Sequence, residues 1–248
     1  MTAQDRFPWP NDARAAVSLS FDDARFSQLD EGVPVLGRHG VRGTFYTPPE
    51  RLRERLADWQ AALAAGHEIG NHSLRHSCSG NFVWNARNVL ENYTLEMMDE
   101  ELLEASRRLQ EMLGVPPSTF AYPCGQTFVG RGIDRRSYVP VVARRFLAGR
   151  GFREEFLNRP WFCDLAALGG TEMDSVPLEK LLATLAKAVE QGQWVIFVGH
   201  DVGNLPRQCV TPETLDALCA WCRDPANGIW IDTVARIAAH VAAVRAKS

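Results

Sequence analysis

The stretch AAVSLSFDD, residues 15–23, sets the pattern for the whole chain. Ala15 to Phe21 form a short run of small and apolar residues that favours a buried strand, and this run ends directly in Asp22 and Asp23. Similar short runs recur along the sequence and alternate with longer segments of helical periodicity. This alternation is typical of βα units that build a parallel sheet. The sequence therefore predicts an α/β fold with two carboxylates at the end of a strand.

The remaining elements are expected from the same alternation. Strands are expected at residues 15–21, 42–46, 68–70, 119–122, 145–148, 195–198 and 229–231. Helices are expected near residues 50–65, 94–113, 177–191, 212–222 and 232–246. The segments 77–93 and 124–138 are longer than minimal connections, and loops of that length after strands usually shape a site. We interpret residues 1–248 as a single domain, because the chain has the length of one α/β barrel.

The composition is that of an ordinary folded enzyme. Hydrophobic residues make up 46% of the 248 residues and charged residues 23%, which excludes a disordered or fibrous chain. The formal charge of −3 gives no reason to expect nucleic acid or a membrane as a partner. Residues 1–14 lack the apolar run of a secretion signal, and no later stretch is long and apolar enough to span a membrane. A cytoplasmic location is therefore expected.

The cysteines predict no disulfide framework. The chain has only six, which is sparse for a disulfide scaffold of this length, so reduced thiols are expected. Cys219 and Cys222 form a C-x-x-C pair inside a helical pattern with no second pair nearby. We interpret them as two buried thiols one turn apart rather than as a zinc or redox site.

Two groups of polar residues indicate a metal site. Adjacent carboxylates such as Asp22 and Asp23 repel each other unless a cation or separate roles favour the pair; capping of a turn is the alternative explanation. The segment GHEIGNHSLRH, residues 66–76, offers His72 and His76 four positions apart. This spacing places both rings on one side of a helical turn. Two imidazoles and one carboxylate form a common ligand set for a divalent metal.

Two further strands end in residues suited to acyl transfer. FAYPCG, residues 120–125, ends in a proline–glycine turn, and such a turn leaves backbone N–H groups free for an oxyanion. WVIFVGH, residues 194–200, delivers His200 at the end of an apolar strand, a suitable place for a general acid. Turn geometry and packing are the competing explanations for each segment taken alone. Their shared position past strand ends is typical of barrel active sites.

Taken in order, SFDD, GHEIGNHSLRH, FAYPCG and WVIFVGH resemble four motifs of the polysaccharide deacetylases, the NodB-homology enzymes of carbohydrate esterase family 4. The resemblance extends from about residue 15 to residue 200, and its most specific part is H-E-I-G-N-H-S-x-x-H. It implies a distorted (β/α)7 barrel that removes acetyl groups from a carbohydrate substrate. It also implies one divalent metal ion, Zn²⁺ in the first place, with Co²⁺, Ni²⁺ and Mn²⁺ as alternatives.

The resemblance also implies roles for individual residues. The metal ligands would be Asp23, His72 and His76. Asp22 would be the general base and His200 the general acid. The backbone N–H of Cys124 would bind the oxyanion, and Tyr122 in the same turn is a further candidate for the substrate site.

Three positions depart from the family pattern. Ala24 replaces a glycine that often follows the aspartate pair, and Cys124 replaces a tyrosine. Ala121 occupies the place of an arginine that orients the base in many members. Arg150 and Arg131 are the candidates to replace that arginine. Arg150 is favoured because it follows a strand, as Asp22 and His200 do.

The substrate is the least determined feature. The family's fourth motif, which contains aspartate and tryptophan, is not clearly present, and Asp164, Asp174 and Trp161 are loose candidates for it. A cyclic-imide or allantoin-type amidohydrolase on the same fold is an alternative. A catalytically silent sugar-binding barrel is another, although no expected ligand or acid–base residue has been replaced. The sequence leaves the oligomeric state open.

Overall fold

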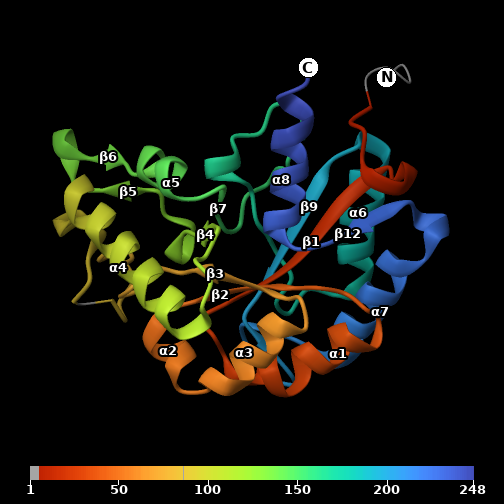
Figure 1. The fold of residues 1–248 in the computed structure, drawn as a ribbon, viewed down its shortest axis with the longest axis horizontal. Helices are drawn as coiled ribbons and strands as arrows, with labels where there is room; N and C mark the ends of the chain where they lie inside the picture. Colours follow the sequence, from red (N-terminus) through yellow and green to blue (C-terminus); the bar gives the residue numbers. More distant parts are fainter. Residues whose placement is uncertain (1–5, 86) are drawn as a thin grey trace.

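A computed structural model describes residues 6–85 and 87–248 and contains one large parallel sheet (Figure 1). Seven of its strands follow the order β7-β4-β3-β2-β1-β9-β8, and an eighth, β12, pairs with β1. The strand bounds are β1 Ala15–Asp22, β2 Thr44–Thr47, β3 Glu68–Asn71, β4 Thr119–Ala121, β7 Ala148–Arg150, β8 Thr171–Glu172, β9 Trp194–Gly199 and β12 Ile229–Ile231. Since all these pairs are parallel, their carboxyl ends meet at one edge.

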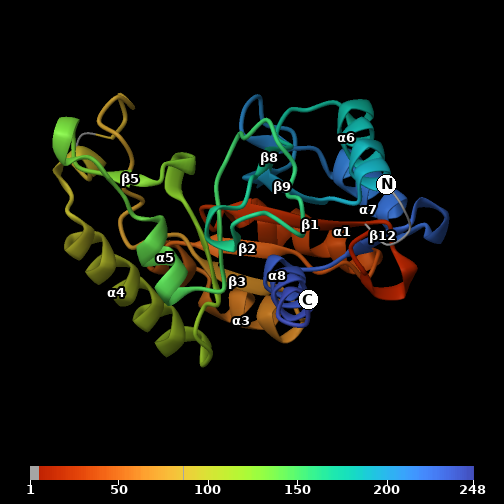
Figure 2. The same ribbon diagram turned by 90° about the horizontal axis from the view of Figure 1, so that it is seen from above.

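Eight α-helices surround this sheet (Figures 1 and 2). They are α1 Val33–Arg38, α2 Pro49–Arg53, α3 Leu56–Ala64, α4 Leu95–Leu113, α5 Val139–Arg145, α6 Leu178–Gln191, α7 Pro212–Arg223 and α8 Val234–Arg245. The described residues also form two short two-stranded sheets. One pairs β5 Phe128–Val129 with β6 Arg136–Ser137, and the other pairs β10 Asp201–Val202 with β11 Cys209–Val210. No helix in the described ranges is long and apolar enough to cross a membrane.

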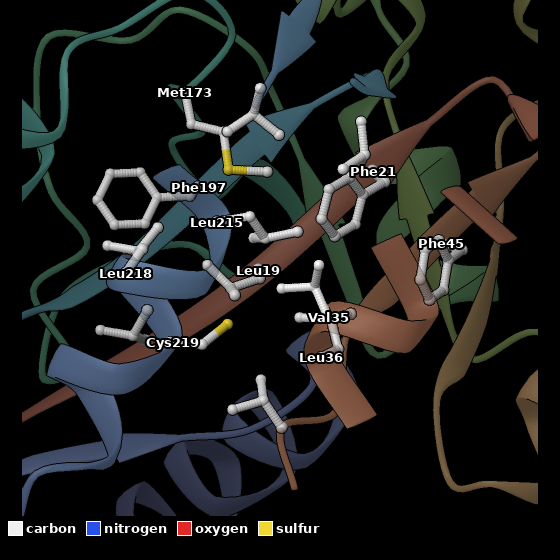
Figure 3. Close-up of a cluster of buried hydrophobic side chains, with 14 of the residues drawn as sticks. Leu19, Phe21, Val35, Leu36, Phe45, Met173, Phe197, Leu215, Leu218 and Cys219 are labelled. Atoms are coloured by element: carbon white, nitrogen blue, oxygen red, sulfur yellow. The ribbon is translucent and has the colours of Figure 1, made fainter. Parts of the chain in front are cut away.

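The central strand β1 is buried along its whole length because it is covered on both faces. Leu19 and Phe21 pack with Phe45 of β2, Phe197 of β9 and Leu215 of α7 in the largest apolar cluster (Figure 3). Burial on both faces is usual for a parallel sheet. The core therefore fixes the strand that carries Asp22 at its end.

Most predicted elements agree with the structure. Strand β8 of the main sheet and the ladders β5–β6 and β10–β11 were not predicted. The strand expected at 145–148 is β7 at 148–150, and the residues before it form α5. Pro140 lies in the first turn of α5, where its missing N–H removes no helical hydrogen bond. The helix expected near 50–65 is divided into α2 and α3, and a π-helical turn, η3 Gln28–Gly32, leads into an unexpected α1.

Candidate metal and catalytic site

A cleft of about 770 Å³ opens at the carboxyl ends of the central strands. Its lining residues come from strand ends and from the loops that follow them. They are Asp22, Asp23, Arg25, His72, His76, Phe82, Trp84, Cys124, Phe152, Arg153, His200, Arg207 and Gln208. The volume is within the usual range for small-molecule sites, so the cleft is the candidate functional site.

Asp23, His72 and His76 point their ligand atoms at one another. Oδ1 of Asp23 lies 3.5 Å from Nε2 of His72 and 3.3 Å from Nε2 of His76. These three atoms all lie within 4.8 Å of each other. Nδ1 of His72 is 2.9 Å from the Ala121 carbonyl oxygen; donation of its N–H there leaves Nε2 free to bind a cation. The set fits a divalent metal ion by donor type and by convergence.

The two histidines do not share a helical turn, contrary to the expectation from their spacing. They lie in the loop after β3, in which Ser73 and His76 have positive φ values of 60° and 51°. The loop is held by its own side chains, because Ser73 N–H donates to Asn71 and His76 N–H to the Ser73 hydroxyl. The rings still meet, with centroids 4.9 Å apart.

The protonation states of these residues suit metal binding. Burial opposes ionisation of Asp23, but the hydrogen bond and charge of His72, together with His76 and His200, hold the pKa of Asp23 well below its usual range. Burial, with the nearby His72 as a second cause, lowers the pKa of His76 to about 4. At neutral pH Asp23 is therefore an anion and His76 is neutral, which are the forms that ligate metals.

Asp22 is oriented by Arg150, although the two residues are far apart in sequence. Nη2 of Arg150 donates to Oδ1 of Asp22, and the side chains of both residues are buried. Arg150 ends β7, and in the parallel register it lies directly opposite Ala121 of β4. The guanidinium therefore comes from the strand beside the position at which the resemblance implies an arginine.

Glycines make room for this arginine and for the ring beneath it. The Arg150 guanidinium carbon lies 4.9 Å from the centre of the Tyr46 ring. A Cβ on Gly70 would lie 2.5 Å from that ring, and a Cβ on Gly170 would lie 2.8 Å from Cδ of Arg150. A side chain at Gly70 would displace the Tyr46 ring, and one at Gly170 would displace Arg150. Close packing therefore explains the glycine at position 70.

His200 is held by Asp174. Nδ1 of His200 is 2.6 Å from Oδ2 of Asp174, and the backbone N–H of His200 donates to the other carboxylate oxygen. Burial disfavours the imidazolium, but the hydrogen bond to Asp174 and the charges of Asp22, Asp174 and Asp23 outweigh it and raise the pKa of His200. The sequence offered Asp174 only as a loose candidate, because nothing local links it to His200.

Comparison with known proteins agrees with this geometry. The family profile described as polysaccharide deacetylase matches residues 10–131, which contain both aspartates and both histidines of the metal site. Over these residues the chain matches the polysaccharide deacetylase family. Among curated proteins it is 28% identical to the uncharacterized protein YlxY of Bacillus subtilis over 39% of this chain and 27% of that protein. It is 24% identical to the peptidoglycan-N-acetylglucosamine deacetylase PgdA of Listeria monocytogenes over 51% of this chain and 24% of that protein.

The chain thus spans about a quarter of the length of these curated relatives, whereas its fold is shared over nearly its full length. A Mycobacterium smegmatis protein assigned to the polysaccharide deacetylases has a TM-score of 0.69 at 15% identity, covering 96% of this chain and 93% of that one. Puue allantoinase gives 0.69 at 14%, covering 96% and 95%. A cobalt-bound acetyl xylan esterase of Clostridium thermocellum gives 0.57 at 21%, covering 90% and 89%. These likenesses confirm the predicted fold, a distorted (β/α)7 barrel.

Two residues predicted for the deacetylase site do not contribute side chains to the cleft. The Tyr122 hydroxyl is buried and donates to the Ala166 carbonyl, 2.6 Å away. Arg131 lies on the surface and donates to Asn92 and to the Glu91 carbonyl. Tyr122 therefore belongs to the apolar core, and Arg131 stabilises the end of the 77–93 loop. The expectation that either side chain serves the site is not met by this arrangement.

The expectation of reduced thiols is wrong for one pair. Cys78 and Cys124 form a disulfide, with Cα atoms 6.3 Å apart. The bond joins the loop that carries His76 to the turn after β4. No sequence spacing indicated it, because the partners are 46 residues apart. Cys163, Cys209, Cys219 and Cys222 are free, and the last two are buried thiols as predicted, with burial raising the pKa of Cys219 to about 12.

Cys124 also presents its backbone to the cleft. Its φ is +55°, and its N–H donates no hydrogen bond to any of the described residues. The flanking Gly125 and Gln126 N–H groups are both bonded within the turn. The Cys124 N–H is therefore the donor of this turn that remains available to a ligand.

Proposed function

We propose that this chain is a metal-dependent hydrolase that removes acetyl groups from an N-acetylated or O-acetylated carbohydrate. The match of residues 10–131 to the polysaccharide deacetylase profile supports deacetylation of a carbohydrate. The observation that carries the proposal is that one cleft contains a metal-ligand set, a candidate general base and a candidate general acid. A three-residue ligand set lies beside an arginine-held carboxylate and near an aspartate-held imidazole.

Asp23, His72 and His76 would hold the divalent cation. When bound, such an ion lowers the pKa of water and polarises a substrate carbonyl. Zn²⁺ suits the ligand set, as do Co²⁺, Ni²⁺ and Mn²⁺, and the acetyl xylan esterase of the same fold was solved with cobalt. The backbone of Ala121 helps to orient this site, because its carbonyl accepts from Nδ1 of His72 and so fixes the tautomer of that ring.

Asp22 would act as the general base. One of its oxygens accepts from Arg150, and the carboxylate lines the cleft beside Asp23, so it is oriented and close to the metal ligands. Neutral asparagine at this position could not accept a proton from water. The Cys124 N–H would donate to the oxyanion that forms when the acyl carbon becomes tetrahedral.

His200 would protonate the leaving group. Asp174 occupies Nδ1, which leaves Nε2 as the nitrogen available to the cleft. A raised pKa keeps the ring protonated over a wider pH range, as a general acid requires. A leaving amine needs this proton more than a leaving alkoxide does, so the pair favours amide substrates.

A screen for acetate release tests the proposal. Metal-loaded protein would be incubated with N-acetylated monosaccharides and oligosaccharides, O-acetylated xylan and cyclic imides. Acetate release from an acetylated sugar, abolished in Asp22→Asn, is the expected result. Ring opening of an imide without acetate release from any sugar would support the allantoinase-like alternative instead, and sugar binding without turnover would support a silent barrel.

A further inference from the structure

The part of the cleft next to His200 is basic. Phe152 packs edge-on against the His200 ring, with centroids 5.7 Å apart, and Arg153 follows it in the chain. On another side, Asp201 N–H donates to the Gln208 carbonyl at 2.9 Å, within the β10–β11 ladder. This bond brings the loop that contains Arg207 back beside His200. Two arginines from separate loops thus line the cleft at the end that holds the proposed acid.

At this end of the cleft, the charge of Arg207 is not balanced by a neighbouring carboxylate among the described residues. The acidic lining residues are Asp22 and Asp23, and each has an arginine partner, Arg150 and Arg25 respectively. Arg153 pairs with Glu172, which lies outside the lining: Nε donates to Oε2 at 3.0 Å and Nη2 to Oε1 at 2.6 Å, so Nη1 remains for a ligand. Arg207 is exposed, and within residues 6–85 and 87–248 its side chain forms no hydrogen bond or ion pair.

The opposite end of the cleft has a different character. Phe82 and Trp84 stand 5.3 Å apart by ring centroid, and Trp84 lies 6.0 Å from the ring of His76. Both aromatic side chains are partly exposed to solvent. The metal ligand His76 therefore has aromatic neighbours, whereas His200 has Phe152 and two arginines.

The proposed chemistry orients a substrate between these ends. The acyl carbon would lie at the ligand set, and the leaving nitrogen or oxygen would lie at His200, so the sugar that carries it extends toward Arg153 and Arg207. We infer that this chain prefers an acetylated sugar bearing an anionic group, a carboxylate or a phosphate, which these two arginines bind. The planar fork of Arg207 matches both anions, and Nη1 of Arg153 can add a further hydrogen bond. The inference rests on the proposed deacetylation.

Matched substrates and variants test it. N-acetylglucosamine is neutral, N-acetylglucosamine 6-phosphate carries a phosphate, and N-acetylmuramic acid carries a carboxylate. We expect kcat/KM to be higher for at least one anionic sugar than for the neutral one, and the two anionic arms identify which group is preferred. Arg207→Gln and Arg153→Gln should each lower kcat/KM for that sugar by about tenfold, mainly through KM, as for the loss of a charge-assisted hydrogen bond. The loss of kcat/KM for the neutral sugar should be clearly smaller than the loss for the anionic sugar.

Arg144→Gln is the control, because Arg144 is an exposed arginine of α5 outside the cleft; it should leave all three substrates unaffected. Equal kcat/KM for neutral and anionic sugars, or equal losses on both in the arginine variants, would overturn the inference while leaving deacetylation standing. Calorimetric binding to metal-loaded Asp22→Asn separates the two proposals. Selective binding of an anionic sugar, lost in the added Arg207→Gln, would uphold the subsite even if no acetate is released by the unmutated protein.

Discussion

The two adjacent aspartates of this site, Asp22 and Asp23, have different neighbours. Asp22 is buried and faces Arg150, whereas Asp23 faces two imidazoles and is partly exposed. From the sequence, a nearby cation or separate roles were expected for the pair, because adjacent carboxylates repel each other. The sequence favoured Arg150 over Arg131 from its position after a strand, but the neighbouring position of Arg150 and Ala121 follows only from the pairing of β7 with β4.

The two aspartates should respond differently to the same substitution. Asp23→Asn, like His72→Ala or His76→Ala, removes one of three ligands and should abolish stoichiometric metal binding. Asp22→Asn should retain the metal and lose turnover. Metal analysis of the purified variants checks this, and a metal-free Asp22→Asn beside a fully loaded Asp23→Asn would show that the roles are reversed.

Removal of Arg150 should be costly to stability. Arg150→Met leaves the Asp22 carboxylate buried without its partner, and breaking a buried pair in this way costs about 3–5 kcal/mol. The double variant Arg150→Met/Asp22→Asn should recover much of that loss, because no uncompensated charge remains. Urea unfolding measures both, with Arg131→Met as a surface control expected within about 0.5 kcal/mol of the parent. A stable Arg150→Met protein would contradict the pairing.

The link between Asp174 and His200 predicts a shift in pH dependence. Asp174 raises the pKa of His200 against the effect of burial, so Asp174→Asn should lower that pKa. Because a general acid works only while protonated, activity is lost as the pH rises through the pKa of His200. The basic limb of the kcat/KM profile should therefore move to lower pH in Asp174→Asn. Asp164→Asn, which alters a cap at Ala166, should leave that limb in place; equal shifts in both would refute the link.

At the scale of elements, the strands were more predictable than the loops. Apolar runs identified β1 and β9 because their burial follows from composition alone. β7 was predicted three residues too early because the apolar Phe146 and Leu147 precede it, and Phe146 instead caps the end of α5. The His72–His76 segment was expected to be helical but is a loop held by Asn71 and Ser73, so the correct ring geometry arose from a different backbone.

The disulfide between two of these loops gives a direct chemical prediction. In denaturant without reductant, thiol titration should find four free cysteines, and after reduction it should find six, since only Cys78 and Cys124 are bonded. The double variant Cys78→Ser/Cys124→Ser should lose about 2–4 kcal/mol of unfolding free energy, because the crosslink restricts the unfolded chain. The free-cysteine variant Cys209→Ser provides the comparison for removal of a thiol alone. Six titratable thiols before reduction would rule out the bond.

At the scale of the whole molecule, one parallel sheet assembles a site from segments distributed between residues 22 and 208. Its central strands deliver Asp22 and His200, and their loops supply the histidines, the disulfide and the arginines. The motif order predicted this fold, and the residues of its motifs Asp22, Asp23, His72, His76 and His200 line one cleft. The motif order could not predict contacts such as that between Asp174 and His200, because these depend on the conformations of loops that are separate in the sequence.

Metal dependence of acetate release tests the central claim most directly. Protein stripped with a chelator would be titrated with Zn²⁺ or Co²⁺ while acetate release from an N-acetylated sugar is measured. We predict no release without metal and a rise that saturates at one ion per chain, absent in His72→Ala at the same metal concentrations. Full activity of the stripped protein in the presence of chelator, or saturation with one ion per chain and no acetate from any acetylated sugar, would contradict the account.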